Sequence, residues 1–245
     1  MSARVLVTGA TGTIGSAIAR AFVQHGVAAI GVHHQGAASV ERAEALRESL
    51  GPTAVRVPFD LRNPSEISNG IDTFVRVAGG LDVLVCNAAT FKPGLLVSTD
   101  EPTLADIVAV DLMGPMLCAR AALPAMLRQR KGVILMVSSV ASQRPNRGQS
   151  AYAAAKAGVE GLVRALAVEY ARKGVRVVGV RPGPVDSPMM TGALALAGDE
   201  VKARVPMARL VSADEVARVV RSLASDDASA ITGAIVDVDC GYVLG

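Results

Sequence analysis

The chain is poor in the residues that build metal sites, disulfides and flat aromatic surfaces. It has three histidines, three cysteines and 3% aromatic residues among 245. So few histidines disfavour a histidine-based triad, and we expect no metal site. The cysteines are widely spaced and odd in number, which favours buried thiols over disulfides. This usage is typical of a reducing compartment, so we expect a cytoplasmic protein. The cysteines are Cys86, Cys118 and Cys240.

Long apolar runs and strong charge are also absent. No apolar run approaches the roughly 18–20 residues of a membrane span, and no signal-peptide core precedes the first glycine. The net charge is only +3 and the basic residues are scattered, which disfavours nucleic acid as a partner. The 51% hydrophobic content can bury a large core. No linker or repeat divides the sequence, so we predict one domain over residues 1–245.

Short apolar runs alternate with segments of helical periodicity. A strand at residues 5–8 is followed by a glycine-rich turn and a helix at 16–25, which is the first half of a βαβ unit. The sequence therefore predicts an α/β fold of Rossmann type, with a doubly wound, seven-stranded parallel sheet flanked by helices. A long helical region at 100–130 is expected to be interrupted near Gly114-Pro115. Further strands are expected at 27–33, 55–57, 81–86, 133–137, 175–180 and 235–238.

The glycine-rich turn predicts a dinucleotide site. Glycines let the backbone approach a pyrophosphate, and the N-terminus of the next helix offers unpaired N–H groups to it. The spacing is Gly-x-x-Gly-x-x-Gly, and the turn directly follows a strand. The residues expected to bind the cofactor here are Gly9, Thr11, Gly12, Thr13, Ile14 and Gly15.

The end of the second strand bears on the choice of cofactor. NAD-preferring enzymes carry an acidic residue there, bonded to the ribose 2′-hydroxyl. This chain has His33 and His34 instead, and no acid until Glu41. A 2′-phosphate would meet no repulsion, and a histidine or Ser39 could donate to it, although no arginine is adjacent. We expect NADP(H) to be preferred over NAD(H); two solvated histidines in a loop would leave both cofactors usable.

Tyr152 and Lys156 are separated by three alanines that favour helix, so both side chains lie on one face, a turn apart. A nearby ammonium is expected to lower the phenol pKa from about 10 toward the working range. Ser139 lies thirteen residues before Tyr152, after an apolar run that predicts a buried strand. From the residues alone either Ser138 or Ser139 could supply the active hydroxyl. The Tyr-x-x-x-Lys pair by itself is a weak signal.

With the glycine turn and Ser139, the chain resembles the classical short-chain dehydrogenase/reductase family over nearly its whole length. The resemblance implies that Ser139, Tyr152 and Lys156 are catalytic. Asp111 takes the place of the family's asparagine, which bends a helix through a water and links the lysine to solvent. Asp111 could hold the same water, but only as an acceptor. The glycine spacing is closer to the extended or atypical branches.

The resemblance also implies further cofactor contacts. In the family, the corresponding residues lie beside the adenine, the ribose and the nicotinamide, and the catalytic tyrosine and lysine contact the cofactor as well. On this basis the expected contacts are Asp60 and Leu61 at the adenine, Asn87, Ala88 and Ala89 at the ribose, and Pro182, Gly183, Val185 and Ser187 at the nicotinamide, together with Tyr152 and Lys156.

The implied activity is reversible hydride transfer between a nicotinamide and a carbonyl or alcohol carbon. The C-terminal half is most similar to 3-oxoacyl-[acyl carrier protein] reductases, which predicts a 3-oxoacyl thioester linked to acyl carrier protein or CoA. A stretch of small residues at 188–205 is expected to form a flap over the substrate. Two alternatives stay open: an alcohol or hydroxysteroid-type dehydrogenase acting on a free small molecule, and a nucleotide-binding protein without turnover.

Two further expectations concern partners. The helix after Tyr152 has apolar residues on more than one stripe, which favours burial against another subunit and, with the resemblance, a homotetramer. Four basic residues could receive an acidic carrier protein, or they could be solvated helix ends. These residues are Arg128, Arg130, Arg172 and Lys173.

Overall fold

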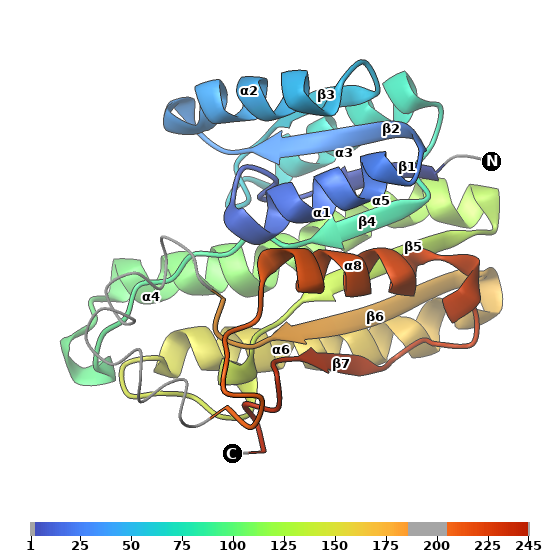
Figure 1. The fold of residues 1–245 in the computed structure, drawn as a ribbon. Helices are drawn as coiled ribbons and strands as arrows, with labels where there is room; N and C mark the ends of the chain where they lie inside the picture. The colour runs from blue at the N-terminus through green and yellow to red at the C-terminus, as the bar shows by residue number, and fades with distance from the viewer. Residues whose placement is uncertain (1–2, 186–204, 245) are drawn as a thin grey trace.

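A computed structural model describes residues 3–185 and 205–244. Its seven strands form one parallel sheet in the order β3-β2-β1-β4-β5-β6-β7 (Figure 1). The fold predicted from the sequence, a doubly wound seven-stranded parallel sheet, is thereby confirmed, whereas the boundaries of a single domain stay a prediction. The strands are β1 (Ala3–Val7), β2 (Val27–His34), β3 (Ala54–Pro58), β4 (Val83–Cys86), β5 (Gly132–Val137), β6 (Val175–Pro182) and β7 (Ile235–Val238).

Helices cover both faces of this sheet, as Figure 1 shows. Alternate residues of β1 enter different cores: Val5 and Val7 pack with α1, α2 and α8, whereas Leu6 packs with α3, α5 and α6. Strands buried on both faces are apolar throughout, which explains the unbroken Val/Ile/Leu runs. The helices are α1 (Thr13–Gln24), α2 (Val40–Leu50), α3 (Pro64–Ala78), α4 (Glu101–Val108), α5 (Gly114–Gln129), α6 (Ser150–Tyr170) and α8 (Ala213–Ala224).

The strand order reverses at β1, which pairs with β2 on one side and β4 on the other. In open α/β sheets such a reversal leaves a crevice at the carboxyl ends of the strands, and ligands bind there. The topology alone therefore places the candidate site beyond Val7, Cys86 and Val137, the last residues of β1, β4 and β5.

The long helical region is interrupted directly before Gly114-Pro115, near the predicted position. The irregular turn is a π turn, η3 (Ala109–Met113), and α5 continues from it with Pro115 in its first turn. Asp111 lies in this π turn, a feature often found at functional sites. Residues 101–129 are long and apolar enough to span a membrane by length and composition, but half of their most apolar window is buried inside the protein, as in a core helix.

Candidate active site

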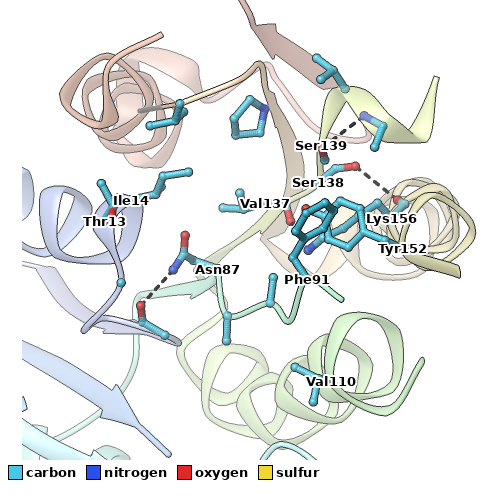
Figure 2. Close-up of a pocket in the computed structure, with 18 of the residues that line it drawn as sticks. Thr13, Ile14, Asn87, Phe91, Val110, Val137, Ser138, Ser139, Tyr152 and Lys156 are labelled. Atoms are coloured by element: carbon cyan, nitrogen blue, oxygen red, sulfur yellow. Dashed lines mark hydrogen bonds between the residues drawn. The ribbon is translucent and has the colours of Figure 1, made fainter. Parts of the chain in front are cut away.

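A cavity of about 530 Å³ opens at the carboxyl ends of the strands. Its walls come from the glycine-rich turn, the ends of β2, β4, β5 and β6, and the first turns of α6. Figure 2 shows that Tyr152 and Lys156 lie beside Ser138 and Ser139, with Asn87 and the turn residues Thr13 and Ile14 toward the other end of the cavity. The cavity thus brings together Ser139, Tyr152, Lys156 and most of the predicted cofactor-binding residues.

The glycine-rich turn presents backbone to the cavity. Gly9 has φ +61°, and a Cβ there would lie 2.7 Å from the Cα of Ala88. Of the six predicted turn residues, all but Gly15 line the cavity; a Cβ on Gly15 would lie 2.2 Å from the Gly9 carbonyl oxygen, so Gly15 serves the packing of the turn. Helix α1 has no acidic residue in its first turn, and its N-terminus is therefore free to favour an anion. These features fit the pyrophosphate of a dinucleotide.

His33 has a different role from the one expected. Its Nδ1 accepts the Gly9 N–H at 2.9 Å, and its Nε2 lies 3.0 Å from the Phe59 carbonyl oxygen. Burial lowers the pKa of His33 to about 4, so the ring is neutral at physiological pH. With both nitrogens engaged, His33 cannot donate to a 2′-phosphate as predicted; it fixes the glycine-rich turn to the ends of β2 and β3.

His34 lies next to it but is only partly bonded. Its Nδ1 is 3.2 Å from the Ser39 hydroxyl, whereas its Nε2 has no partner among the described residues. His34 and Ser39 both line the cavity, and so does Arg42 from the first turn of α2. Arg42 was not predicted from the sequence, because only the residues directly after the second strand were considered for the 2′-phosphate. The first turn of the helix that follows this strand is a second place from which a basic residue can reach the cavity.

The predicted ribose contacts are held by the end of β1. The Thr8 hydroxyl accepts the N–H groups of Asn87 and Ala88 at 2.9 and 3.1 Å, and the Asn87 side chain donates to the Thr8 carbonyl at 3.0 Å. Asn87, Ala88 and Ala89 all line the cavity. The sequence Asn-Ala-Ala thus joins β4 to the glycine-rich turn and leaves small side chains toward the ligand.

Of the predicted adenine pair, Leu61 lines the cavity and Asp60 does not. The Asp60 carboxylate accepts hydrogen bonds from the Arg62 guanidinium at 2.8 Å and the Gln35 amide at 2.9 Å. The Arg62 hydrogen bond is the main cause that lowers the pKa of Asp60. The predicted contact of the Asp60 side chain with the adenine is therefore not supported by its placement.

At the other end of the cavity, Pro182 ends β6 and Gly183 and Val185 follow it, and all three line the wall as predicted. The Gly183 N–H donates to the Val238 carbonyl at 2.9 Å, and a Cβ on Gly183 would lie 2.8 Å from the Asp239 Cα. Only glycine fits this close approach, so the turn follows β7 tightly. Ser187 and residues 188–204 of the predicted flap lie outside the described residues.

Lys156 is the buried cation of the site. Its side chain is 2% exposed, its Nζ donates to the Val137 carbonyl at 3.2 Å, and Nζ lies 5.6 Å from the centre of the Tyr152 ring. Burial lowers the pKa of Lys156, and the negative charge of Asp111 opposes this effect. The helical spacing therefore places the ammonium beside the phenol, as predicted.

The expected lowering of the Tyr152 pKa is wrong for this structure. Burial, with the charge of Asp111 as a second cause, raises the pKa of Tyr152 to about 12, and a hydrogen bond with Ser139 only partly opposes it. Removal of the phenol from water is the main cause of this rise. A phenol with this pKa keeps its proton at neutral pH, which suits a proton donor.

The two serines at the end of β5 have different partners. The Ser138 hydroxyl donates to Glu160 at 2.8 Å, so it belongs to a buried network behind the cavity. The Ser139 oxygen accepts the Ala141 N–H at 3.2 Å, and the Ser139 hydroxyl lowers the pKa of Tyr152. This arrangement favours Ser139 as the hydroxyl that would meet a substrate.

Asp111 lies behind Lys156 and does not line the cavity. It is fully buried, its Oδ1 accepts the Thr90 N–H at 2.8 Å, and its Oδ2 has no partner among the described residues. Burial raises the pKa of Asp111 to about 6, although Lys156 and the Thr90 hydrogen bond both lower it. A buried polar atom without a partner is costly, and a water is the usual remedy. This geometry is compatible with the predicted water relay.

Comparisons with known proteins show which family the chain is similar to. The chain matches a family model described as enoyl-(acyl carrier protein) reductase over residues 9–243. It is 39% identical to a cis-4-hydroxycyclohexanecarboxylate dehydrogenase of Sinomonas cyclohexanicum, over 97% of this chain and 95% of that protein. It is 37% identical to a 3-oxoacyl-[acyl-carrier-protein] reductase of Staphylococcus aureus, over 100% and 99% of the two chains, and 34% identical to one of Thermotoga maritima, over 98% and 97%.

Proposed function

The chain belongs to the short-chain dehydrogenase/reductase family, and from this membership we propose that it reduces a carbonyl to a secondary alcohol with NADP(H), in a reversible reaction. The observation that carries the proposal is one cavity that joins a glycine-rich turn to Ser139, Tyr152 and Lys156. The intact catalytic set disfavours the alternative of a nucleotide-binding protein without turnover.

Each of these side chains has a separate task. The nicotinamide, when bound, supplies the hydride to the carbonyl carbon or takes it from the alcohol carbon. Tyr152 donates its proton to the oxygen that becomes the alcohol, and Ser139 holds and polarises that oxygen. Lys156 bonds the ribose hydroxyls and places a positive charge beside the phenol. Asp111 holds a water through which the proton of Tyr152 is replaced.

The preference for NADP(H) is supported by the cavity wall near β2. Arg42 and His34 line this end, and no Asp or Glu lines the cavity in the described part of the chain. A guanidinium matches the geometry of a phosphate. We therefore expect Arg42→Gln to reduce the ratio of kcat/KM with NADPH to that with NADH by about tenfold, the effect of one charge-assisted hydrogen bond.

For the substrate, a 3-oxoacyl thioester is the first candidate, because two of the relatives named above reduce such compounds by name. The four basic residues proposed to dock a carrier protein do not support this idea. Arg130 precedes β5 and Lys173 precedes β6, so both lie at the amino ends of the strands, whereas the cavity opens at the carboxyl ends. A carrier protein would have to dock elsewhere.

A free hydroxy acid is the second candidate. The relative at 39% identity is named for a ring alcohol that carries a carboxylate. Such a compound would be oxidised to 4-oxocyclohexanecarboxylate, and the reverse reaction would consume NADPH.

The proposal is tested by following NADPH absorbance with acetoacetyl-CoA, 4-oxocyclohexanecarboxylate, cyclohexanone and a ketosteroid. Turnover of at least one carbonyl supports the reaction, and the ranking of kcat/KM selects between the candidates. If NADPH binds but none of these compounds is reduced at a rate above that of the Tyr152→Phe protein, the nucleotide-binding alternative is correct.

A homotetramer is proposed as well. Apolar side chains are exposed along the α4–α5 region and on α6, and Val168 is 85% exposed. Burial of such side chains against another subunit would remove them from water. Light scattering should give a mass near four times 25.1 kDa, and a monomer at micromolar concentration would contradict the assignment. The cytoplasmic location stays a prediction.

A further inference from the structure

Three cationic side chains among the described residues line the cavity, and the proposed function uses only two of them. Arg42 lies toward the end of β2 and Lys156 lies beside Tyr152, whereas Arg144 follows Ser139 by five residues. Arg144 is half-buried and lines the same cavity as Ser139 and Tyr152. Neither the proton transfer nor the predicted cofactor contacts involve it. Its charge therefore needs a separate explanation.

The guanidinium of Arg144 is held in place by the C-terminal segment. Its NH1 donates to the Tyr242 carbonyl at 2.7 Å, and its Cζ lies 5.4 Å from the centre of the Tyr242 ring. The Asn146 amide donates to the Tyr242 hydroxyl at 3.3 Å, which fixes the same ring from another direction. Tyr242 is itself buried. A side chain positioned in this way loses little conformational entropy when it binds a ligand.

This held cation has no carboxylate partner within the described residues. Arg4, Arg62 and Arg209, by contrast, each pair with an Asp or Glu at 2.7–2.8 Å. The guanidinium of Arg144 has five N–H donors, and the hydrogen bond to the Tyr242 carbonyl uses one of them. Most of the planar guanidinium therefore stays available within the described part of the protein. No Asp or Glu of the described part lines the cavity. Within residues 3–185 and 205–244, the site thus offers an anion-binding group and no competing acid.

We propose that Arg144 binds an anionic oxygen group of the substrate, at a position remote from the reacting carbonyl. The inference rests on the proposed function and adds a substrate class to it: carbonyl compounds that carry a negative charge. Two sources share this chemistry. The charge is either the carboxylate of a free oxo acid or the phosphate of a pantetheine thioester. Both match the fork of a guanidinium, in two parallel hydrogen bonds.

The test compares each charged substrate with a neutral analogue of the same reacting part. For the carboxylate source the pair is 4-oxocyclohexanecarboxylate and its methyl ester; for the phosphate source it is acetoacetyl-CoA and the N-acetylcysteamine thioester of acetoacetate. The variants are Arg144→Gln, which removes the charge, and Arg144→Lys, which keeps it without the fork. Arg147→Gln is the matched control, because Arg147 is exposed in the same loop and does not line the cavity.

We expect Arg144→Gln to raise KM about 10- to 100-fold for the charged member of one pair, because the variant loses a hydrogen bond to a charged group. The effect on KM for the neutral analogue should be much smaller. Arg144→Lys should be intermediate, and Arg147→Gln should match the wild type. The pair that responds identifies the source of the charge. If Arg144→Gln changes charged and neutral substrates equally, or if wild type prefers both neutral analogues, the inference is wrong.

A binding measurement separates this inference from the proposed reaction. Cyclohexanecarboxylate has the charge but no ketone, so its affinity for the complex with NADPH does not depend on turnover. Calorimetry with the wild type, Arg144→Gln and Arg147→Gln should show weaker binding only for Arg144→Gln if the carboxylate is the ligand. Pantetheine 4′-phosphate serves in the same way for the phosphate. If no carbonyl is reduced but the anion still binds in a way that depends on Arg144, the proposed function is wrong and the anion site is supported. If all three proteins bind the anion equally, the anion site is wrong and the proposed function is unaffected.

Discussion

Two buried carboxylates differ in how they are bonded: Glu160 belongs to helix α6, and Asp111 lies in η3, which packs against α6. Glu160 accepts hydrogen bonds from the hydroxyls of Ser138 and Ser142 and from two nitrogens of Arg181. Burial acts to raise the pKa of Glu160, but these donors together outweigh burial and lower the pKa below its usual value. Glu160 therefore stays ionised. Asp111 has the single Thr90 bond and an Oδ2 without a described partner, and its pKa rises to about 6.

Burial acts to raise the pKa of both acids, so the number of hydrogen-bond donors decides which acid stays ionised. Glu160 holds the residues on both sides of Ser139, because Ser138 precedes it and Ser142 follows it. It therefore acts as a positioning residue. Asp111 can exchange a proton near neutrality and faces the charge of Lys156, which suits a relay. The same contrast occurs at His33, bonded at both nitrogens, and His34, bonded at one.

The largest effect is expected at the fully bonded acid. Glu160→Gln removes the charge that compensates the buried guanidinium of Arg181, which is 4% exposed in its side chain. Breaking a buried ion pair in this way costs about 3–5 kcal/mol of unfolding free energy. Urea unfolding measures it, and Asp237→Asn is the control, since Asp237 pairs with the same arginine from a more exposed position. Equal losses in the two variants would remove the special role of Glu160.

Asp111→Asn should have a smaller effect of the opposite sign. A folded-state pKa of about 6, above the usual 3.8, means that the folded protein binds the proton more tightly than the unfolded chain does. The stability contributed by this group is present below pH 4 and is lost as the pH rises to 6. The asparagine variant should gain up to about 3 kcal/mol relative to wild type between pH 4 and pH 8, at 1.36 kcal/mol per pKa unit. A gain that is equal at both pH values would contradict the raised pKa.

The two histidines give the smallest stability effect. His33→Ala leaves the Gly9 N–H and the Phe59 carbonyl without a partner and should cost about 1–3 kcal/mol, whereas His34→Ala should cost less than about 1 kcal/mol. Thermal unfolding of the two proteins compares them. A larger loss at His34 would mean that its second nitrogen has an important partner after all.

Much of this molecule could be predicted from the sequence, because its signals are local. The sheet follows from apolar runs and turns, and the placement of Tyr152 beside Lys156 follows from helical spacing. The roles of His33 and Asp60 could not be predicted, since their partners Gly9, Phe59 and Gln35 are distant in sequence. The raised pKa of Tyr152 was also beyond prediction, because the degree of burial depends on the whole fold. Arg42 and Arg144 join the cavity only through tertiary structure.

Tyr152 is the proton donor of the proposed mechanism, and Tyr152→Phe tests this role directly. The phenyl ring keeps the edge-to-face contact with Phe91, 5.3 Å between ring centres, so the fold and the affinity for NADPH should be retained. Loss of the general acid should reduce kcat by about 10²–10⁴-fold, measured with the best substrate of the carbonyl panel. A variant that binds NADPH normally and retains more than about half of the wild-type kcat would contradict the assignment, and with it the proposed mechanism.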